Sequence, residues 1–362
     1  MKKYEKFLKN FFIFLFIYLL FHSITWLMFT SKIFGQPNGI YGGDLTRITY
    51  SFDILNPRQL KYTLSNKHLS KETYKYQNID VITIGDSFSN GIANGLNPYY
   101  QDYLATKYNL NVLNILMDDK LNFLNTVIGL YNNGTLKKIS PHFIIIETIQ
   151  REIIHLNLDN INFNYHLQHT NINDIVAPRL KQNPIPNLSI INNINYKVPF
   201  YFFYSLIKKH KIHNGYKFYL KKNLFFNNKS NKLVVYKNDI NNIPQFSKKN
   251  IKKLNNKLNR LANILQKLNI TLIFMPAVDK YDLYYPYIKN KAYPKSQFFE
   301  TLRPQKKQYI FIDTKKILSR SLQNNISDIF YQDDTHWSYK ASDIVTDAKE
   351  FKDIFQGYPN AL

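Results

Sequence analysis

Between residues 78 and 149, short apolar segments alternate with amphipathic segments. Residues 78–84, 111–117 and 142–149 are rich in Ile, Val, Leu and Phe and predict short strands, the last of them buried on both faces. Residues 99–108, just after Pro98, and 121–131 predict helices between them. An alternation of strand and helix is typical of a parallel sheet with helices packed against it.

The pattern returns near the C-terminus after a long interruption. Ser247 is a candidate N-cap for a helix with apolar residues at three- and four-residue spacing up to Leu268. Residues 270–275 and 309–312 predict a fourth and a fifth strand, and an apolar stripe over 341–355 predicts one closing helix. Residues 151–245 have no clear period and are rich in Asn, Tyr, Phe and His. We interpret this stretch as an insertion in the α/β domain.

The N-terminal region contains an uncharged run, 11–30, rich in Phe, Leu and Ile. About 20 such residues cross the roughly 30 Å of hydrocarbon in a bilayer, so the run predicts a transmembrane helix. Four lysines precede it and only Lys32 follows closely, which places the N-terminus in the cytoplasm and the rest of the chain outside. A cleaved signal peptide is the alternative, but its apolar region is usually shorter and no small-x-small cleavage site follows here.

These patterns divide the chain into four parts. We expect a basic cytoplasmic tail over 1–10, an anchor over 11–30 in the cytoplasmic (inner) membrane, and an irregular neck over 31–75 with several Gly and Pro residues. A single extracytoplasmic or periplasmic domain follows over 76–362, with the insertion inside it.

Composition narrows the possible chemistry. The chain has no Cys, which excludes disulfides and thiolate catalysis, and the His residues of the insertion lack zinc-protease spacing, so we predict no metal and no cofactor. The formal net charge of +23 suits an anionic glycan or lipid surface, but Lys and Asn are abundant everywhere. No recognised module accompanies the charge, so we do not expect nucleic-acid binding.

The first predicted strand runs into Gly85-Asp86-Ser87-Phe88-Ser89. This places Ser87 at the carboxyl end of a parallel strand, the edge at which open α/β sheets bind ligands. The Ser87 backbone N–H could there stabilise an oxyanion. By itself the motif is more typical of an ordinary turn with a solvated serine, because Gly, Asp and Ser are common turn residues.

A second motif, Asp333-Asp334-Thr335-His336-Trp337, precedes the closing helix. A serine nucleophile needs a histidine base, and the base needs a carboxylate that holds its tautomer. We predict His336 as that base and Asp333 as its orienting carboxylate, with Asp334 as the alternative. A capped helix start beside a surface histidine would explain this motif taken alone.

Together, the two motifs resemble those of the SGNH hydrolase superfamily, and Trp337 after the histidine resembles its alginate O-acetyltransferase branch. The stretches 147–151 and 276–281 are also similar to that branch. The resemblance covers roughly 78–350 without the insertion. It implies a flavodoxin-like three-layer fold and a serine that carries an acetyl group to a polysaccharide hydroxyl, with Ser87, His336 and Asp333 or Asp334 as the catalytic residues.

The remaining site residues are less clearly marked, because the glycine after the second strand and the Gly-x-Asn-Asp motif after the third are missing. Gln150 and Arg151 stand at the right strand end to supply oxyanion or substrate contacts, although Arg151 could instead pair with Glu147 or Glu152. Lys280 and Tyr281 follow the fourth strand and could line the cleft or belong to a solvated loop. The aromatic run 201–204 could bind sugar, rest on a membrane or belong to the core.

The leading hypothesis is therefore an O-acetyltransferase for a cell-envelope or exported polysaccharide, working with a multi-span membrane protein that delivers acetyl groups. A glycan O-deacetylase or esterase shares the acyl-enzyme and is the first alternative. A non-catalytic glycan-binding assembly subunit is the second. A lipase of the same superfamily is less favoured, because no long apolar lid follows Ser87.

Overall fold

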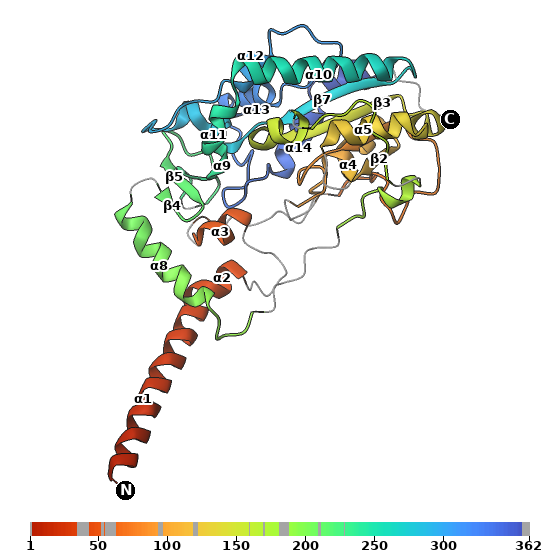
Figure 1. Ribbon diagram of the computed structural model, residues 1–362. Coiled ribbons are helices and arrows are strands. Elements are labelled where there is room, and N and C mark those ends of the chain that lie inside the picture. The colour runs from red at the N-terminus through yellow and green to blue at the C-terminus, as the bar shows by residue number, and fades with distance from the viewer. Residues whose placement is uncertain are drawn as a thin grey trace.

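The chain combines a doubly wound α/β domain with a long N-terminal helix that projects away from it (Figure 1). The computed structural model describes residues 2–34, 43–51, 54, 63–92, 97–118, 122–158, 160–168, 171–180, 188–208, 211–227 and 229–356. The parts of the predicted neck at 35–42, 52–53 and 55–62 lie outside the described residues.

The described residues form a five-stranded sheet in which every neighbouring pair is parallel. Its strands are β1 (Val81–Ile84), β2 (Val112–Ile115), β3 (Phe143–Ile149), β7 (Thr271–Ala277) and β8 (Ile310–Phe311). The order β2-β1-β3-β7-β8 is the flavodoxin-like order, with the switch point between β1 and β3. All five predicted strands are confirmed, and so is the α/β fold class.

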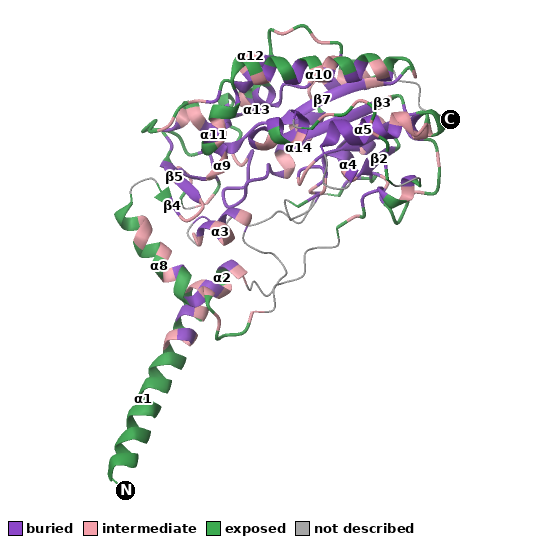
Figure 2. Ribbon diagram, viewed as in Figure 1, coloured by how far each residue is buried: buried purple, intermediate pink, exposed green. Residues whose placement is uncertain are grey.

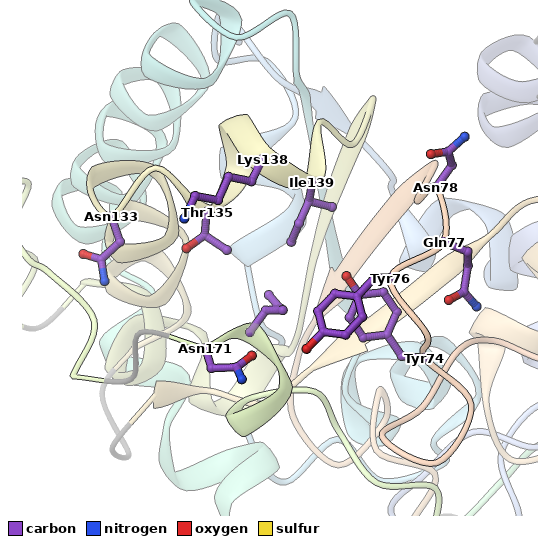
Figure 3. A pocket seen from close by; sticks show the side chains of 10 residues that line it. Tyr74, Tyr76, Gln77, Asn78, Asn133, Thr135, Lys138, Ile139 and Asn171 are labelled. Carbon is purple, nitrogen blue, oxygen red and sulfur yellow. The ribbon is translucent and has the colours of Figure 1, made fainter.

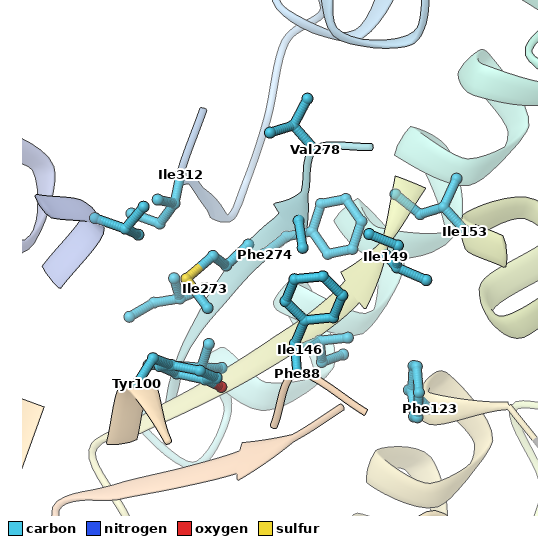
Figure 4. Packing of buried hydrophobic residues seen from close by; sticks show 14 of the residues in the cluster. Phe88, Tyr100, Phe123, Ile146, Ile149, Ile153, Ile273, Phe274, Val278 and Ile312 are labelled. Carbon is cyan, nitrogen blue, oxygen red and sulfur yellow. The ribbon is translucent and has the colours of Figure 1, made fainter. Parts of the chain in front are cut away.

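Helices cover both faces because the chain moves outward from β1 in opposite directions and right-handed crossovers then fall on opposite sides. One group comprises α14 (Tyr339–Thr346) and the two helices that it contacts, α4 (Tyr100–Tyr108) and α13 (Thr314–Gln323). The other comprises α5 (Phe123–Asn132), α7 (Ile153–Leu158) and α10 (Lys248–Gln266). Between them lies a continuous apolar core in which Phe88, from the turn after β1, packs among residues of β3, β7 and the helices (Figure 4).

Shorter helices connect these elements. They are α3 (Asp44–Thr49), α6 (Thr135–Ile139), η4 (Gln150–Glu152), η5 (Ile172–Asp174), α9 (Asn238–Asn241), η6 (Ile243–Gln245), α11 (Lys280–Tyr284), η7 (Tyr285–Tyr287), α12 (Phe298–Leu302) and α15 (Lys349–Phe355). The single closing helix expected over 341–355 is wrong: α14 ends at Thr346, and Ala348 takes an extended ψ of 153° before α15 begins. The break lets Phe355 pack against Phe143 at the start of β3.

The segment predicted as an insertion, 151–245, does contain regular structure. It lies in sequence between β3 and β7, which are neighbours in the sheet. Its strands β4 (Lys211–Ile212), β5 (Gly215–Tyr219) and β6 (Lys232–Tyr236) form a small antiparallel sheet. The aromatic run belongs to a further helix, α8 (Ile194–Ile207), which contacts the N-terminal helix.

The N-terminal helix is long and apolar enough to cross a membrane. It comprises α1 (Lys2–Thr25), the π-helical turns of η1 (Trp26–Thr30) and α2 (Ser31–Phe34), and only 11% of its most apolar window is buried. Figure 2 shows most of α1 as exposed, in contrast to the buried strands of the α/β domain. An exposed helix with an uncharged apolar run of 20 residues, 11–30, is unlike the core helix of a soluble domain.

Candidate active site

The turn after β1 presents Ser87 at the carboxyl edge of the sheet. A Cβ on Gly85 would lie 2.4 Å from Glu147 Oε2 and 2.2 Å from Ser89 Oγ, so only glycine allows this turn to pass so close to β3. The Asp86 carboxylate accepts hydrogen bonds from the backbone N–H of Ile149 (2.6 Å) and of Phe88 (3.1 Å). Burial raises the pKa of Asp86, although these two hydrogen bonds oppose the shift. The turn is thus tied to the end of β3.

A closed loop brings His336 to the same edge. An antiparallel bridge between Phe330 and Trp337 joins the two ends of the loop. Inside it, the buried Lys280 ammonium donates to the carbonyl oxygens of Tyr331 (2.8 Å), Gln332 (2.7 Å) and Asp334 (3.0 Å). Burial lowers the pKa of Lys280 to about 8, although the surrounding aspartates oppose the shift.

Ser87, His336 and Asp334 form a continuous hydrogen-bonded chain. Ser87 Oγ lies 2.7 Å from His336 Nε2, and His336 Nδ1 lies 2.6 Å from Asp334 Oδ1. His336 and Asp334 are buried, whereas Ser87 is partly exposed. If Nδ1–H donates to the carboxylate, Nε2 is free to accept the Ser87 proton, which is the arrangement that activates a serine nucleophile. Residues 249 positions apart are therefore placed for proton transfer.

The ring contact of His336 corrects the expected carboxylate assignment. Asp334, the alternative, orients the imidazole, whereas Asp333 accepts a hydrogen bond from the Gly43 backbone N–H (3.0 Å). Asp334 can reach the ring because its Oδ1 also accepts the His336 backbone N–H at 3.0 Å, which folds the carboxylate back over the turn. The two-residue spacing between Asp334 and His336 allows both of these contacts within one turn.

Asp44 is a further carboxylate at the site, and the sequence interpretation missed it. It is the first residue of α3, in the predicted neck, and accepts hydrogen bonds from both the backbone N–H and the side-chain hydroxyl of Thr335. Its Oδ2 lies 3.7 Å from His336 Nδ1. The only signal in the sequence was an aspartate after two glycines, and nothing local connects it with residue 335.

The charges around His336 favour its protonated form. Burial alone would lower the pKa of His336, but the Asp334 and Asp44 carboxylates outweigh burial and raise it. Burial and the neighbouring Asp334 in turn raise the pKa of Asp44 to about 6. The two carboxylates therefore stabilise the imidazolium that forms when His336 accepts a proton.

Among the residues that the structure describes, Asp44, Asp334 and His336 are close enough to hold a metal ion together, since their ligand atoms lie within 4.8 Å of one another. Both ring nitrogens of His336, however, are already engaged with Asp334 and Ser87. A metal would have to break one of these hydrogen bonds. The absence of a metal or cofactor stays a prediction.

In the part of the chain that the structure describes, the side chains of Gln150 and Arg151 contact buried residues and not Ser87. They are therefore not placed as oxyanion donors. The buried Gln150 amide donates to Asp282 (3.0 Å) and Ser296 (2.7 Å), and its oxygen accepts the Asp279 N–H. Arg151 Nη1 pairs with Asp239 (3.2 Å) and Asp279 (3.4 Å), and not with Glu147 or Glu152, the partners considered as the alternative to a site role. Both side chains brace the ends of β3 and β7 from inside.

Lys280 and Tyr281 are adjacent in sequence but have different roles in the structure. Neither belongs to a solvated loop, since both are fully buried in α11. Lys280 holds the His336 loop, as described above. The Tyr281 hydroxyl donates to the Tyr293 carbonyl oxygen (2.9 Å), on the side facing β5, where its ring packs against Phe218. Lys280 thus supports the site and Tyr281 supports the core.

A cavity of about 390 Å³ lies elsewhere, at the amino ends of β1 and β3 (Figure 3). Tyr74, Tyr76, Lys138 and Asn171 are among the residues that line it. Tyr74 and Tyr76 precede β1, and Lys138 lies on α6, just before β3, while Asn171 reaches the cavity from the start of η5, after β3. Ser87, in contrast, follows β1. The cavity is therefore distinct from the Ser87 site at the opposite edge of the sheet.

No protein-family model matches the chain, and no curated protein sequence matches it. What the fold and the site define is a doubly wound α/β protein with a Ser–His–Asp chain at the carboxyl edge of its sheet.

Proposed function

We propose that this protein is a membrane-anchored serine O-acetyltransferase that modifies hydroxyl groups of a cell-envelope or exported polysaccharide. The observation that carries the proposal is the Ser87–His336–Asp334 hydrogen-bonded chain at the ligand-binding edge of a flavodoxin-like sheet. The resemblance of its two motifs to the alginate O-acetyltransferase branch of the SGNH superfamily supplies the acyl group and the acceptor class.

The proposed reaction has two steps. Ser87 Oγ attacks the carbonyl carbon of an acetyl donor while His336 Nε2 takes the hydroxyl proton and then gives it to the departing group. A sugar hydroxyl next attacks the acetyl-serine, His336 takes its proton, and that proton returns to Ser87 Oγ as the ester bond to the enzyme breaks. Asp334 and Asp44 stabilise the imidazolium in both steps, and the Ser87 backbone N–H is the expected oxyanion donor.

The N-terminal helix supports the proposed location. Its length suits a single pass through the cytoplasmic membrane, and the lysines before it favour a cytoplasmic N-terminus and an extracytoplasmic α/β domain. An acetyl donor made in the cytoplasm would then have to cross the bilayer. We therefore propose a multi-span membrane protein as the partner that delivers the acetyl group, with no cofactor bound to this chain and no nucleic-acid ligand.

The test is to trap the acetyl-enzyme. The full chain in detergent micelles is mixed with an activated acetyl ester, quenched rapidly and analysed by intact mass and peptide mapping, with Ser87→Ala and Ser89→Ala as a matched pair. We expect one acetyl group on Ser87, formed in the wild type and in Ser89→Ala but not in Ser87→Ala. Faster loss of the adduct on addition of polysaccharide than in buffer would indicate transfer.

Two other outcomes correspond to the alternative functions. An adduct that disappears at the same rate with or without polysaccharide would favour a glycan O-deacetylase or esterase, since water then resolves the acyl-enzyme. If no adduct forms even with membranes that contain the acetyl-delivering partner, and Ser87→Ala leaves cellular acetylation unchanged, the catalytic proposal is rejected. A glycan-binding assembly subunit would then be favoured.

A further inference from the structure

The helix α8 has two different apolar faces. Its inner face packs on the protein: Val198 is fully buried, and Tyr201 stacks on Tyr50 and His213 with ring centroids 5.3 and 4.2 Å away. Its outer face carries a stripe at positions 196, 200, 203 and 207, a spacing of four, three and four residues that keeps these side chains on one side of the helix. A helix that is apolar all round needs a partner for both faces.

The outer stripe is exposed to an unusual degree for a soluble domain. Phe203 is 62% and Ile207 78% accessible, compared with 72% for Phe14 in the middle of α1. The same face includes Tyr196 and Phe200, and Leu206 lies beside it. An exposed apolar patch of contiguous aromatic and aliphatic residues marks an interaction surface.

The position of α8 relates this stripe to the membrane. Its first turn is bound to the end of α1: the Tyr196 hydroxyl lies 3.1 Å from His22 Nε2, Asn195 Nδ2 lies 2.8 Å from His22 Nδ1, and the Tyr196 ring stacks on Phe21. From this contact α8 runs across the direction of α1 rather than along it (Figure 1). His22 lies in the outer half of the apolar run 11–30, so this attachment places the start of α8 at the level of the outer leaflet.

We infer that the stripe formed by Tyr196, Phe200, Phe203 and Ile207 is a membrane-surface anchor that inserts into the outer leaflet of the bilayer crossed by α1. The occupant is lipid because the stripe continues the apolar surface of η1, where Leu27 and Met28 are exposed. The exposed Lys197 on α8 and Lys208 directly after the helix are placed to contact lipid phosphates. This inference rests on the proposed membrane anchoring by α1.

A second attachment to the membrane, through α8, would fix the orientation of the α/β domain. A single spanning helix followed by a long neck would leave the α/β domain free to tilt. With α8 held in the interface and packed on β4 through its inner face, the domain keeps one orientation towards the membrane. The Ser87 edge would then lie at a constant height above the lipid surface, which suits a substrate delivered through the bilayer.

The absence of cysteine allows a direct test by single labels in the full chain. Four variants are compared in vesicles of phosphatidylethanolamine and phosphatidylglycerol: Phe203→Cys and Ile207→Cys on the stripe, Phe14→Cys in α1, and Lys252→Cys on α10. Each carries an environment-sensitive fluorophore, which is quenched either by nitroxide-labelled lipid or by iodide in the water.

We expect the labels at 203 and 207 to be quenched several-fold more by the nitroxide lipid, and several-fold less by iodide, than the label at 252. Their depth should be about 5–10 Å into the headgroup and acyl boundary. Iodide quenching at 203 and 207 equal to that at 252 would overturn the inference. Protection from both quenchers would also overturn it and indicate coverage by protein, such as a second copy.

The label in α1 separates this inference from the anchoring proposal. Lipid quenching at 14 without lipid quenching at 203 and 207 would retain the spanning helix and reject the α8 anchor. Loss of lipid quenching at all three positions would instead reject the membrane anchoring on which the inference rests.

Discussion

Gly43 approaches Asp333 so closely that a Cβ on Gly43 would lie 2.2 Å from the Asp333 carbonyl oxygen. The two residues are 290 positions apart and are also joined by the hydrogen bond from the Gly43 N–H to the Asp333 carboxylate. The start of α3 is thus fitted against the loop that carries His336. A segment that the sequence suggested was only a neck is part of the site.

This close approach predicts that Gly43→Ala disturbs the site. Overpacking of this kind costs about 1–3 kcal/mol when the surroundings cannot adjust, and the neighbour here is backbone of the His336 loop. We expect a lower kcat for acetyl-ester turnover per folded molecule and a lower Tm. Gly134→Ala is the matched control, since its new Cβ meets nothing within 4 Å although its φ of 73° strains alanine. That control should lower Tm while leaving kcat unchanged; equal kcat losses in both variants would contradict the prediction.

The two neighbouring aspartates give a second prediction. Asp334→Asn should reduce kcat by about 10⁴-fold, the effect of losing the orienting carboxylate in a Ser–His–Asp triad. Asp333→Asn should reduce it far less, because Asp333 contacts Gly43 and not the ring. Steady-state kinetics with an activated acetyl ester distinguishes the two. A larger loss for Asp333→Asn would restore the assignment first expected from the sequence.

Asp44 should control the pH dependence of the reaction. His336 must be neutral to accept the Ser87 proton, so activity should rise as pH passes its pKa, which lies above the ordinary 6.5. Asp44→Asn removes one of the charges that raise this pKa while keeping one oxygen that can accept one of the two Thr335 hydrogen bonds. The acidic limb of kcat/KM should then move to lower pH. An unchanged limb, or one displaced to higher pH, would show that Asp44 does not act on His336.

Lys280 should be needed for the shape of the loop. Lys280→Met leaves three buried carbonyl oxygens without their donor, and each unsatisfied group costs about 1–3 kcal/mol. We expect a lower Tm together with a lower kcat at temperatures where the variant is folded. Lys315→Met is the matched control, because Lys315 is also buried and ion-paired, with Asp282 and Glu300, but does not contact the loop. If both variants lose kcat equally, Lys280 has no specific effect on the site.

The local pattern of apolar and polar residues was sufficient to predict much of the fold. All five strands of the sheet were predicted from short, largely apolar runs, of which β1 and β2 are buried throughout. The helices α4, α5 and α10 followed from their helical spacing. Ser87 and His336 could also be identified, since a serine after a strand-end glycine and a histidine beside a carboxylate pair are local signals. The apolar run 11–30 was an equally clear local signal, in this case for a helix long enough to cross a membrane.

What only the tertiary structure decided depends on contacts between distant segments. Carboxylates two or three residues before His336 could both orient its ring. Asp334 does so, and not Asp333, because of how the turn between residues 333 and 336 folds. Asp44 reaches His336 only because α3 docks on a loop 290 residues away, and Gln150 and Arg151 turn inward because buried aspartates of other elements accept their hydrogen bonds. Side-chain type and spacing determine strands, helices and candidate nucleophiles, whereas the partner of each buried polar group is set by which surfaces the folded chain brings together.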